Sequence, residues 1–330
     1  MISSDKIIES LESEFPGTIK KASNSPKILQ LRTGVFTIDL LTGGIPLNKF
    51  TVLWGPKSSG KSTLSYKIID SYFKATDYKC VYADFEKGFN RDWAEKFITD
   101  MDRLIWFEPL YGEHGVDSIY KLAQADDIGL IIIDSIAMIF SIVEAEATAE
   151  SNFVGPSARL IRQMFNKLLV AMSQARQNDR LLTVVIINQV RANIGAQKFA
   201  SQTRMPGGKI IDHLTSLTLK LYHKSYKSVE GIPTTSTHTF TVEKNRLGLP
   251  KMSGEFVIDL IRGKVDDEKP ILEYAKRYNL LTKNKKSFSL LGETRPTLKE
   301  LKQLLNQEDF RNMVVEAIIN QYRKEVYSDS

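Results

Sequence analysis

The sequence predicts an α/β protein built on a mostly parallel sheet. Short, nearly continuous apolar runs recur at 50–54, 80–85, 104–107, 129–134 and 181–188. Such runs are typical of strands that are buried on both faces. Amphipathic helical stretches alternate with them, which favours a doubly wound domain. A glycine-rich loop joins the first of these strands to the first of these helices.

Two helices carry most of this pattern. The one after the glycine-rich loop has four apolar residues on one face, Leu64, Ile68, Ile69 and Tyr72. A longer one, between the last two strands, has a single stripe of Ile161, Met164, Phe165, Leu168, Leu169 and Met172. Stripes of this kind are expected to pack against the sheet.

After residue 215 the pattern changes. The segments 216–223, 238–245 and 254–260 alternate apolar and polar residues, which predicts a meander that extends the sheet. A small α+β unit is expected to follow, with a helix at 270–279, a hairpin around 283–286 and two closing helices. Thr297 and Glu300 form a capping box at the start of one of these.

A short amphipathic helix is predicted at 3–15, with Ile7, Ile8, Leu11 and Phe15 at helical spacing, followed by a polar linker. A helix this short is marginal alone, so its stripe should dock on the chain's own core or on a neighbouring subunit. We therefore expect three units: 1–29 for subunit contact, 30–265 as the core and 266–330 as a small C-terminal domain.

The composition fits a globular protein of 330 residues, 42% hydrophobic and 25% charged. No apolar run is long enough to span a membrane and the N-terminus lacks the pattern of a signal peptide, so a cytoplasmic location is expected. The single cysteine, Cys80, cannot form an internal disulfide. The net charge of +6 permits a polyanionic partner, but solubility explains it equally well.

The glycine-rich loop matches the phosphate-binding pattern G-x-x-x-x-G-K-[ST], between a predicted strand and a predicted helix. Its backbone N–H groups are expected to surround phosphate oxygens. Lys61 should reach the β- and γ-phosphates, and the Ser62 hydroxyl should bind Mg²⁺. The predicted nucleotide-binding residues are Gly55, Pro56, Lys57, Ser58, Ser59, Gly60, Lys61, Ser62 and Thr63.

Further polar residues end the apolar strands. Asp134 closes the run at 129–134, where a buried carboxylate needs a cation such as Mg²⁺; a helix cap is the alternative. Glu86 is preferred, only slightly over Asp84 or Asp134, as the base that activates water. Gln189 ends another strand and is a candidate γ-phosphate sensor, although a simple polar strand end explains it equally well.

Two connections, 143–157 and 190–208, are too long for simple turns. The second contains Arg191, Lys198, Phe199 and Arg204, and Lys209 follows it. Cations with one aromatic residue suit a groove that follows a nucleic-acid backbone and stacks or wedges between bases. A plain mobile surface loop is the alternative for both connections.

Several motifs together resemble those of the RecA family of recombinases: GPKSSGKST, ADFEKGFN, IIIDSIAM, VIINQVRANIG and, upstream, TGVFTIDLLTGGIPLNKF. The similarity covers about 30–262, and its divergence resembles phage-type members such as the UvsX group. It implies a RecA-like P-loop fold and an ATPase that uses ATP and Mg²⁺ and forms helical filaments on single-stranded DNA. Homologous pairing and strand exchange with duplex DNA would follow, with single-strand-binding and loader proteins as possible partners.

The resemblance also implies roles for single residues. Glu86 falls on the family's water-activating glutamate, Gln189 on its γ-phosphate sensor and Trp93 on the aromatic residue that stacks on adenine. Lys244 and Arg246 match a basic pair that reaches a neighbouring subunit's ATP, with arginine in place of the second lysine.

The same resemblance makes the two long connections DNA-binding loops. Gly207 and Gly208 in the second loop and Lys209 directly after it are further expected contacts, and Asn152 and Phe153 are the expected contacts of the first. Two rival functions stay open: a hexameric RecA-fold helicase or ATPase motor, and a non-catalytic ATP-binding recombination mediator.

Overall fold

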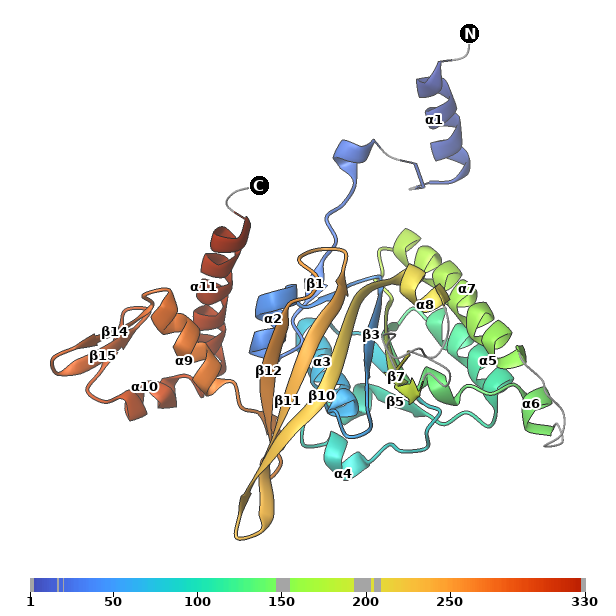
Figure 1. Cartoon of the computed structure of the whole chain (residues 1–330). Coiled ribbons are helices and arrows are strands. Elements are labelled where there is room, and N and C mark those ends of the chain that lie inside the picture. Colours follow the sequence, from blue (N-terminus) through green and yellow to red (C-terminus); the bar gives the residue numbers. More distant parts are fainter. Residues whose placement is uncertain are drawn as a thin grey trace.

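The computed structural model describes residues 3–16, 18–19, 21–146, 155–192, 203–204 and 209–327. Within these residues the largest sheet has nine strands in the order β13-β12-β11-β10-β3-β7-β6-β4-β5 (Figure 1). All neighbours from β10 to β5 are parallel, whereas β10 to β13 pair antiparallel. The predicted α/β fold with a mostly parallel sheet is confirmed.

The five apolar runs all form strands, shifted by at most two residues at either end. They are β3 (Phe50–Gly55), β4 (Lys79–Asp84), β5 (Leu104–Phe107), β6 (Ile128–Asp134) and β7 (Thr183–Gln189). The predicted meander forms β10 (Thr215–Val229), β11 (Ile232–Asn245) and β12 (Ser253–Asp259), and β13 (Lys264–Val265) completes the sheet.

Strands β10 and β11 extend well beyond the predicted segments and project from the sheet as a long ribbon (Figure 1). Val229 pairs with Ile232 across a two-residue turn in which Glu230 and Gly231 both have positive φ, 52° and 80°. Positive φ at both positions is typical of the hairpin turn that matches strand twist. The sequence did not predict the full length of the ribbon because its outer part is polar. Backbone pairing rather than burial holds this part together.

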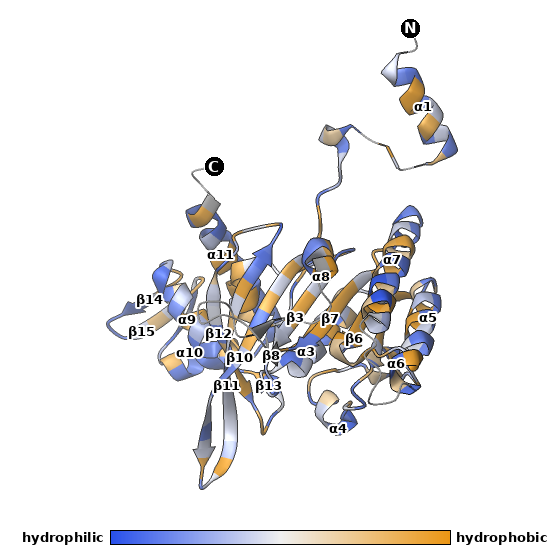
Figure 2. Cartoon of the chain, turned by 45° about the vertical axis from the view of Figure 1, so that its right-hand side comes forward, coloured by the Kyte–Doolittle hydropathy of each residue, from blue (hydrophilic) through white to orange (hydrophobic). Residues whose placement is uncertain are grey.

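The helices cover both faces of the sheet. On one face lie α2 (Phe36–Thr42) and α3 (Lys61–Ala75), and on the other α5 (Gly112–Ala123) and α7 (Pro156–Gln177). Alternate side chains of each central strand enter the two cores: Leu53 packs on the α3 side, and Val52 on the α7 side. Figure 2 shows the hydrophobic strands between helices whose outer surfaces are hydrophilic.

The predicted stripe of α7 is buried except for Leu169, which is 37% exposed because it lies at the edge of the helix-sheet contact. The sequence pattern did not indicate α2, α4 (Arg91–Ala94) or α5. The remaining short elements near the core are η2 (Met101–Arg103), η3 (Ile136–Met138), and the paired strands β1 (Gln30–Leu31) and β2 (Ile45–Pro46).

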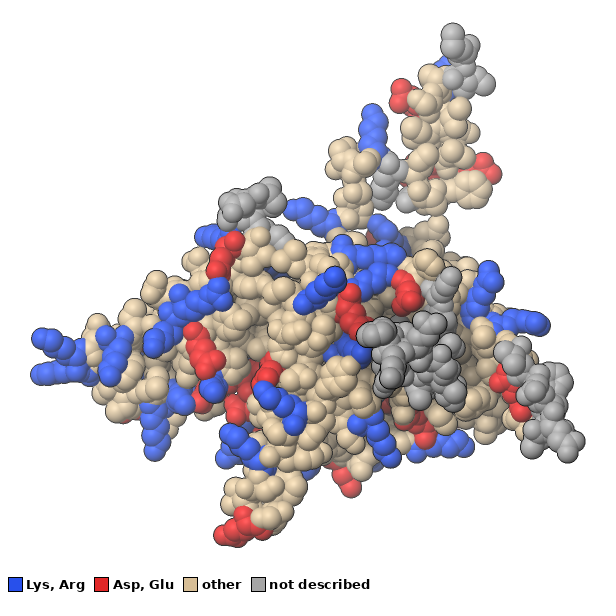
Figure 3. All heavy atoms as spheres, in the orientation of Figure 1, with Lys and Arg blue, Asp and Glu red and all other residues tan. Residues whose placement is uncertain are grey.

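The C-terminal elements contain the predicted helix, hairpin and two closing helices. They are α9 (Glu268–Arg277), β14 (Leu281–Asn284), β15 (Ser287–Leu290), β16 (Glu293–Arg295), α10 (Leu298–Leu304) and α11 (Glu308–Tyr327). Thr297 caps α10 by accepting the Glu300 N–H at 3.2 Å. Lysine and arginine side chains gather at the outer end of these elements, on the left in Figure 3.

The N-terminal helix α1 (Ser4–Glu14) forms as predicted, and the 3-10 turn η1 (Ala22–Asn24) follows it. None of the α1 residues is buried, and its apolar stripe does not dock on the chain's own core. Ile7, Leu11 and Phe15 are 49%, 37% and 51% exposed, and the helix stands away from the body (Figure 1). Among the described helices, none has the length and apolar character needed to cross a membrane.

Removing the Phe165 ring should test the α7 side of the core. Phe165 is fully buried and packs edge-to-face on Phe50, with the ring centroids 5.1 Å apart. We expect Phe165→Ala to lower the free energy of unfolding by about 3–5 kcal/mol in urea titrations, because it leaves a cavity. Leu169→Ala, on the exposed edge of the same helix, is the control and should cost far less.

Candidate nucleotide site

The phosphate-binding loop connects the end of β3 to the start of α3, as the sequence predicts. Ser58 and Gly60 have positive φ, 62° and 87°. At Gly60 a Cβ atom would also lie only 3.0 Å from the His238 ring, so both backbone conformation and space require glycine there. The backbone at Gly60 is therefore one that only glycine adopts without strain.

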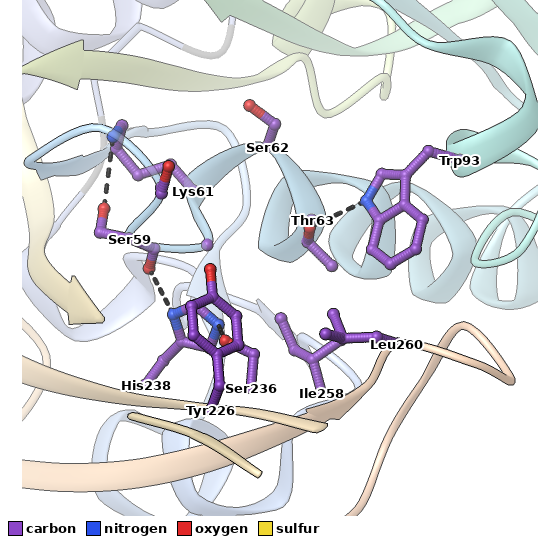
Figure 4. Close-up of a pocket in the computed structure, with 12 residues that line it drawn as sticks. Ser59, Lys61, Ser62, Thr63, Trp93, Tyr226, Ser236, His238, Ile258 and Leu260 are labelled. Atoms are coloured by element: carbon purple, nitrogen blue, oxygen red, sulfur yellow. Dashed lines mark hydrogen bonds between the residues drawn. The ribbon is translucent and has the colours of Figure 1, made fainter. Parts of the chain in front are cut away.

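A cavity of about 280 Å³ opens beside this loop (Figure 4). One wall consists of residues 58–63, and the other of Trp93, Tyr226, Ser236, His238, Ile258 and Leu260. Trp93 donates its indole N–H to Thr63 Oγ1 at 3.1 Å and packs edge-to-face on Phe97. The structure thus places Trp93 in the cavity, although it also contacts the core.

Lys61 is 7% exposed and is held by the loop itself. Its Nζ donates to the carbonyl oxygens of Pro56 at 2.6 Å and Gly55 at 3.1 Å, and to Ser59 Oγ at 3.3 Å. Burial lowers the pKa of Lys61, while Asp134 and Glu86 act in the opposite direction. The ammonium group is therefore desolvated and surrounded by oxygen atoms, an arrangement that phosphate oxygens can take over.

Ser62 and Asp134 lie together, as a shared cation site requires. Ser62 Oγ donates to Asp134 Oδ2 at 3.0 Å, and the Tyr82 hydroxyl donates to the same oxygen at 2.5 Å. Burial, with a smaller contribution from Glu86, raises the pKa of Asp134 to about 6. A hydroxyl beside a buried carboxylate suits a hard cation such as Mg²⁺.

Glu86 and Gln189 are brought into direct contact. Gln189 Nε2 donates to Glu86 Oε1 at 2.5 Å, joining the segment after β4 to the end of β7. Asp84, the alternative base, instead accepts the backbone N–H groups of Gly88 and Phe89 at 3.2 and 2.9 Å. Because those bonds use both oxygens of Asp84 to hold the following turn, Glu86 is the carboxylate left facing Gln189.

The 190–208 connection starts directly after Gln189. Strands β8 (Arg191–Ala192) and β9 (Thr203–Arg204) pair antiparallel, with Arg191 opposite Arg204, and α8 (Lys209–Leu214) follows. The connection is therefore closed at its base by a short ladder. Four of its predicted DNA-contacting residues lie outside the described residues: Lys198, Phe199, Gly207 and Gly208.

The first predicted loop is shorter than expected at both ends. Helix α6 (Ile142–Glu146) occupies its beginning, and α7 starts at Pro156. Glu144 of α6 accepts hydrogen bonds from the backbone N–H and the hydroxyl of Ser157, which links the two helices. Residues 143–146 and 156–157 are thus helical rather than loop. The predicted contacts Asn152 and Phe153 lie outside the described residues.

Lys244 and Arg246 do not lie at the phosphate-binding loop of their own chain. Lys244 donates to the carbonyl oxygen of Asp212, and Arg246 to that of His213 at 2.5 Å, at the end of α8. Lys244 pairs with Thr218, which lies opposite Val52 in the middle of β3, and Arg246 lies nearer the start of that strand. Burial and the neighbouring Arg246 lower the pKa of Lys244.

Sequence reasoning missed Tyr82 and five residues of the cavity wall: Tyr226, Ser236, His238, Ile258 and Leu260. Tyr82 lies within an apolar run and resembles an ordinary core residue. Tyr226 and His238 lie on the β10–β11 ribbon, far in sequence from the loop that they adjoin. No sequence signal marks them, because only the pairing of β10 with β3 brings the ribbon to the loop.

The pKa of Asp134 gives a pH-dependent prediction. The unfolded chain loses this proton near pH 4, whereas the native protein keeps it until about pH 6, so native stability falls across this interval. Asp134→Asn should remove this loss. At 1.4 kcal/mol per pKa unit, the ligand-free variant should exceed the wild type by about 3 kcal/mol above pH 7 and lose the advantage at pH 4.

Urea titrations of the wild type and the variant at both pH values measure this difference in the free energy of unfolding. The contributions of the other titrating groups are the same in both proteins and cancel in the difference. Asp84→Asn is the matched control: it loses one of two bonds to backbone N–H groups and should be less stable than the wild type at both pH values. An Asp134→Asn advantage that does not change between pH 4 and 7 would contradict the prediction.

Comparisons with known proteins show similarity along most of the chain. The family model described as the RecA N-terminal domain matches residues 5–264. The chain is 31% identical over 303 residues to Protein RecA of Ureaplasma parvum serovar 3, covering 88% of each, and 29% identical over 293 residues to Protein RecA of Nautilia profundicola, covering 86% of this chain and 81% of the relative.

Among solved structures, the RadB recombinase has a TM-score of 0.53 at 20% identity and covers 72% of this chain and 98% of its own, which shows a shared fold. The family model spans well over half of the chain, including the phosphate-binding loop, Glu86 and Gln189. The chain therefore belongs to the RecA family of recombinases.

Proposed function

We propose that this protein is an ATP-dependent DNA recombinase that forms helical filaments on single-stranded DNA and exchanges strands with a homologous duplex. The observation that carries the proposal is the 2.5 Å contact between Gln189 and Glu86. Gln189 lies two residues before Arg191, where the β8–β9 ladder closes the base of the 190–208 loop. A change in the contacts of Gln189 at the nucleotide would therefore act directly on the base of the 190–208 loop.

The cavity beside the phosphate-binding loop is the proposed ATP site. Backbone N–H groups of residues 55–63 and the Lys61 ammonium would hold the triphosphate, with Lys61 exchanging its carbonyl partners for phosphate oxygens. Ser62 and Asp134 would hold Mg²⁺, whose charge would offset that of the phosphates. Trp93, on the cavity wall, would stack on the adenine ring.

Glu86 is proposed to accept a proton from the attacking water. While Gln189 donates to Glu86, one carboxylate oxygen is occupied. When a γ-phosphate is present, the Gln189 amide would donate to it instead, which frees Glu86 and shifts the end of β7. Hydrolysis would restore the original contact and loosen the loop that starts at Arg191.

DNA would be bound by the 143–157 and 190–208 loops. Arg191, Lys198, Arg204 and Lys209 would contact phosphates, Phe199 would stack or wedge between bases, and the backbone at Gly207 and Gly208 would allow close approach. In the first loop the contacts would come from Asn152 and Phe153. This set suits a strand that is held by its backbone and leaves the bases free for pairing.

Neighbouring subunits would complete each site. The exposed apolar stripe of α1 would dock on the next subunit's core, and Lys244 with Arg246 would reach its ATP, giving an open helical assembly. We further propose that 1–29, 30–265 and 266–330 act as the subunit contact, the ATPase core and a small C-terminal domain. We expect the protein to act in the cytoplasm, with a phage-type member as the nearest subtype.

Strand exchange between a circular single strand and its linear duplex is the direct test. We expect joint molecules with ATP and Mg²⁺ and none without ATP. Lys61→Ala should abolish them, because the cavity loses its only buried cation among the described lining residues. Closed rings alone in electron microscopy with ATP and DNA would instead indicate a motor. Nucleotide binding without DNA-stimulated hydrolysis would indicate a mediator.

Glu86→Gln should reduce DNA-stimulated ATP hydrolysis by roughly 10²–10⁴-fold, because glutamine cannot accept the proton from water. Nucleotide binding should persist, so the variant should stay on single-stranded DNA longer, as measured by DNA release after dilution. Glu108→Gln is the control, since Glu108 forms an ion pair with Lys87 at the surface. Fast turnover in Glu86→Gln would assign the base to another residue.

A further inference from the structure

His238 on β11 lies directly against the phosphate-binding loop and bonds to it (Figure 4). Its Nδ1 lies 3.0 Å from the Ser59 carbonyl oxygen, and its Nε2 lies 2.9 Å from Ser236 Oγ. The side chain is 3% exposed. A buried imidazole with a hydrogen bond at each nitrogen is therefore part of the wall of the nucleotide cavity.

The partners determine which nitrogen carries the proton. A carbonyl oxygen can only accept a hydrogen bond, so Nδ1–H must donate to Ser59. In the neutral ring, Nε2 must then accept the bond from the Ser236 hydroxyl. The direction of both bonds follows, from the Ser236 hydroxyl through the imidazole to the Ser59 carbonyl.

The ring is also locked in place by its neighbours. It stacks on Phe256 with 5.2 Å between the ring centroids. It also lies so close to Gly60 that a Cβ atom there would be only 3.0 Å from the ring. Burial, with a smaller effect of His223 on the adjacent strand, lowers the pKa of His238 to about 4. Near neutral pH the imidazole is therefore uncharged and keeps this tautomer.

The Ser59 carbonyl belongs to the same planar peptide as the Gly60 N–H. In a trans peptide these two groups point in opposite directions, so a carbonyl held toward His238 turns the Gly60 N–H away from it. Lys61 Nζ also bonds to Ser59 Oγ at 3.3 Å. Ser59 thus links the imidazole on β11 to the two loop groups, an amide and an ammonium, that are available to bind an anion.

We propose that His238 is a positioning residue for ATP binding, which holds the Ser59–Gly60 peptide so that its N–H meets a phosphate oxygen. The proposal rests on the proposed function only for the identity of the nucleotide. A residue that merely filled space would not need two directed bonds, and a buried imidazole without them would be destabilising. The chemistry of His238, and not only its volume, should therefore set the affinity for the triphosphate.

Two substitutions separate these roles. His238→Asn keeps an N–H donor near the place of Nδ1, whereas His238→Leu keeps apolar volume and removes the donor. His223→Asn is the matched control: His223 pairs with His238 across the strands, but has no hydrogen bond to the loop. The dissociation constant for a fluorescent ATP analogue with Mg²⁺ and the melting temperature without nucleotide are measured for each full-length variant.

We expect His238→Leu to raise the dissociation constant and the KM for ATP roughly three- to tenfold, the effect of one lost neutral hydrogen bond. Saturating ATP should restore kcat to near the wild-type value. His238→Asn should recover most of the affinity, and His223→Asn should match the wild type. Equal affinities for His238→Leu and wild type would overturn the proposal, as would a His238→Asn variant as weak as His238→Leu with an unchanged melting temperature.

A low melting temperature identifies a variant that does not fold. If His238→Leu does not fold, His238→Gln replaces it in the comparison of nucleotide affinities, because glutamine offers its N–H farther from the backbone. Its affinity should be lower than that of His238→Asn, and the reverse order would contradict the assigned tautomer. The two proposals fail separately. If the wild type binds ATP but exchanges no strands, the recombinase function fails, while the order of nucleotide affinities still tests His238.

Discussion

The parallel pairing of four central strands is the constraint on which the site depends. Strands β3, β7, β6 and β4 are neighbours and run in the same direction, so their carboxyl ends meet at one edge of the sheet. Each end contributes one part: the phosphate-binding loop after β3, Gln189 from β7, Asp134 from β6 and Glu86 just after β4. Ligands bind at this edge in open α/β sheets for the same reason.

Burial at this edge leaves the site with charges that are poorly compensated. The pKa of Lys61 is lowered and that of Asp134 is raised, so burial acts against the charged form of both groups. The loop carbonyls and the Tyr82 and Ser62 hydroxyls offset part of this cost through hydrogen bonds. A triphosphate with its cation would bring an opposite charge to each group. Binding would therefore offset the desolvation cost of both groups.

The antiparallel half of the sheet gives the site its second wall. Because β10 pairs with β3, the ribbon that it forms with β11 carries Tyr226, Ser236 and His238 to the loop. Lys244 near the end of β11 and Arg246 just after it lie away from the loop of their own chain. The middle of β11 thus contributes to the cavity wall, and its end leads to a basic pair that bonds to α8.

The sequence by itself determined the sheet, its mostly parallel pairing and the phosphate-binding loop, because these depend on local patterns. Continuous apolar runs mark strands buried on both faces, and glycine is needed at Gly60 for its positive φ. It also placed Glu86, Asp134 and Gln189 at strand ends, but only the structure shows which of Glu86 and Asp84 contacts Gln189. In the structure Asp84 accepts hydrogen bonds from the following turn, whereas Glu86 accepts one from Gln189.

Tertiary structure alone decided which distant residues adjoin the loop. His238 lies 179 positions from Ser59 in sequence, and nothing in its own strand indicates the bond between them. The sequence likewise predicted an amphipathic α1 without showing that its stripe stays exposed. Local patterns report how a segment is buried, whereas the identity of its partner depends on strand order, which no single segment encodes.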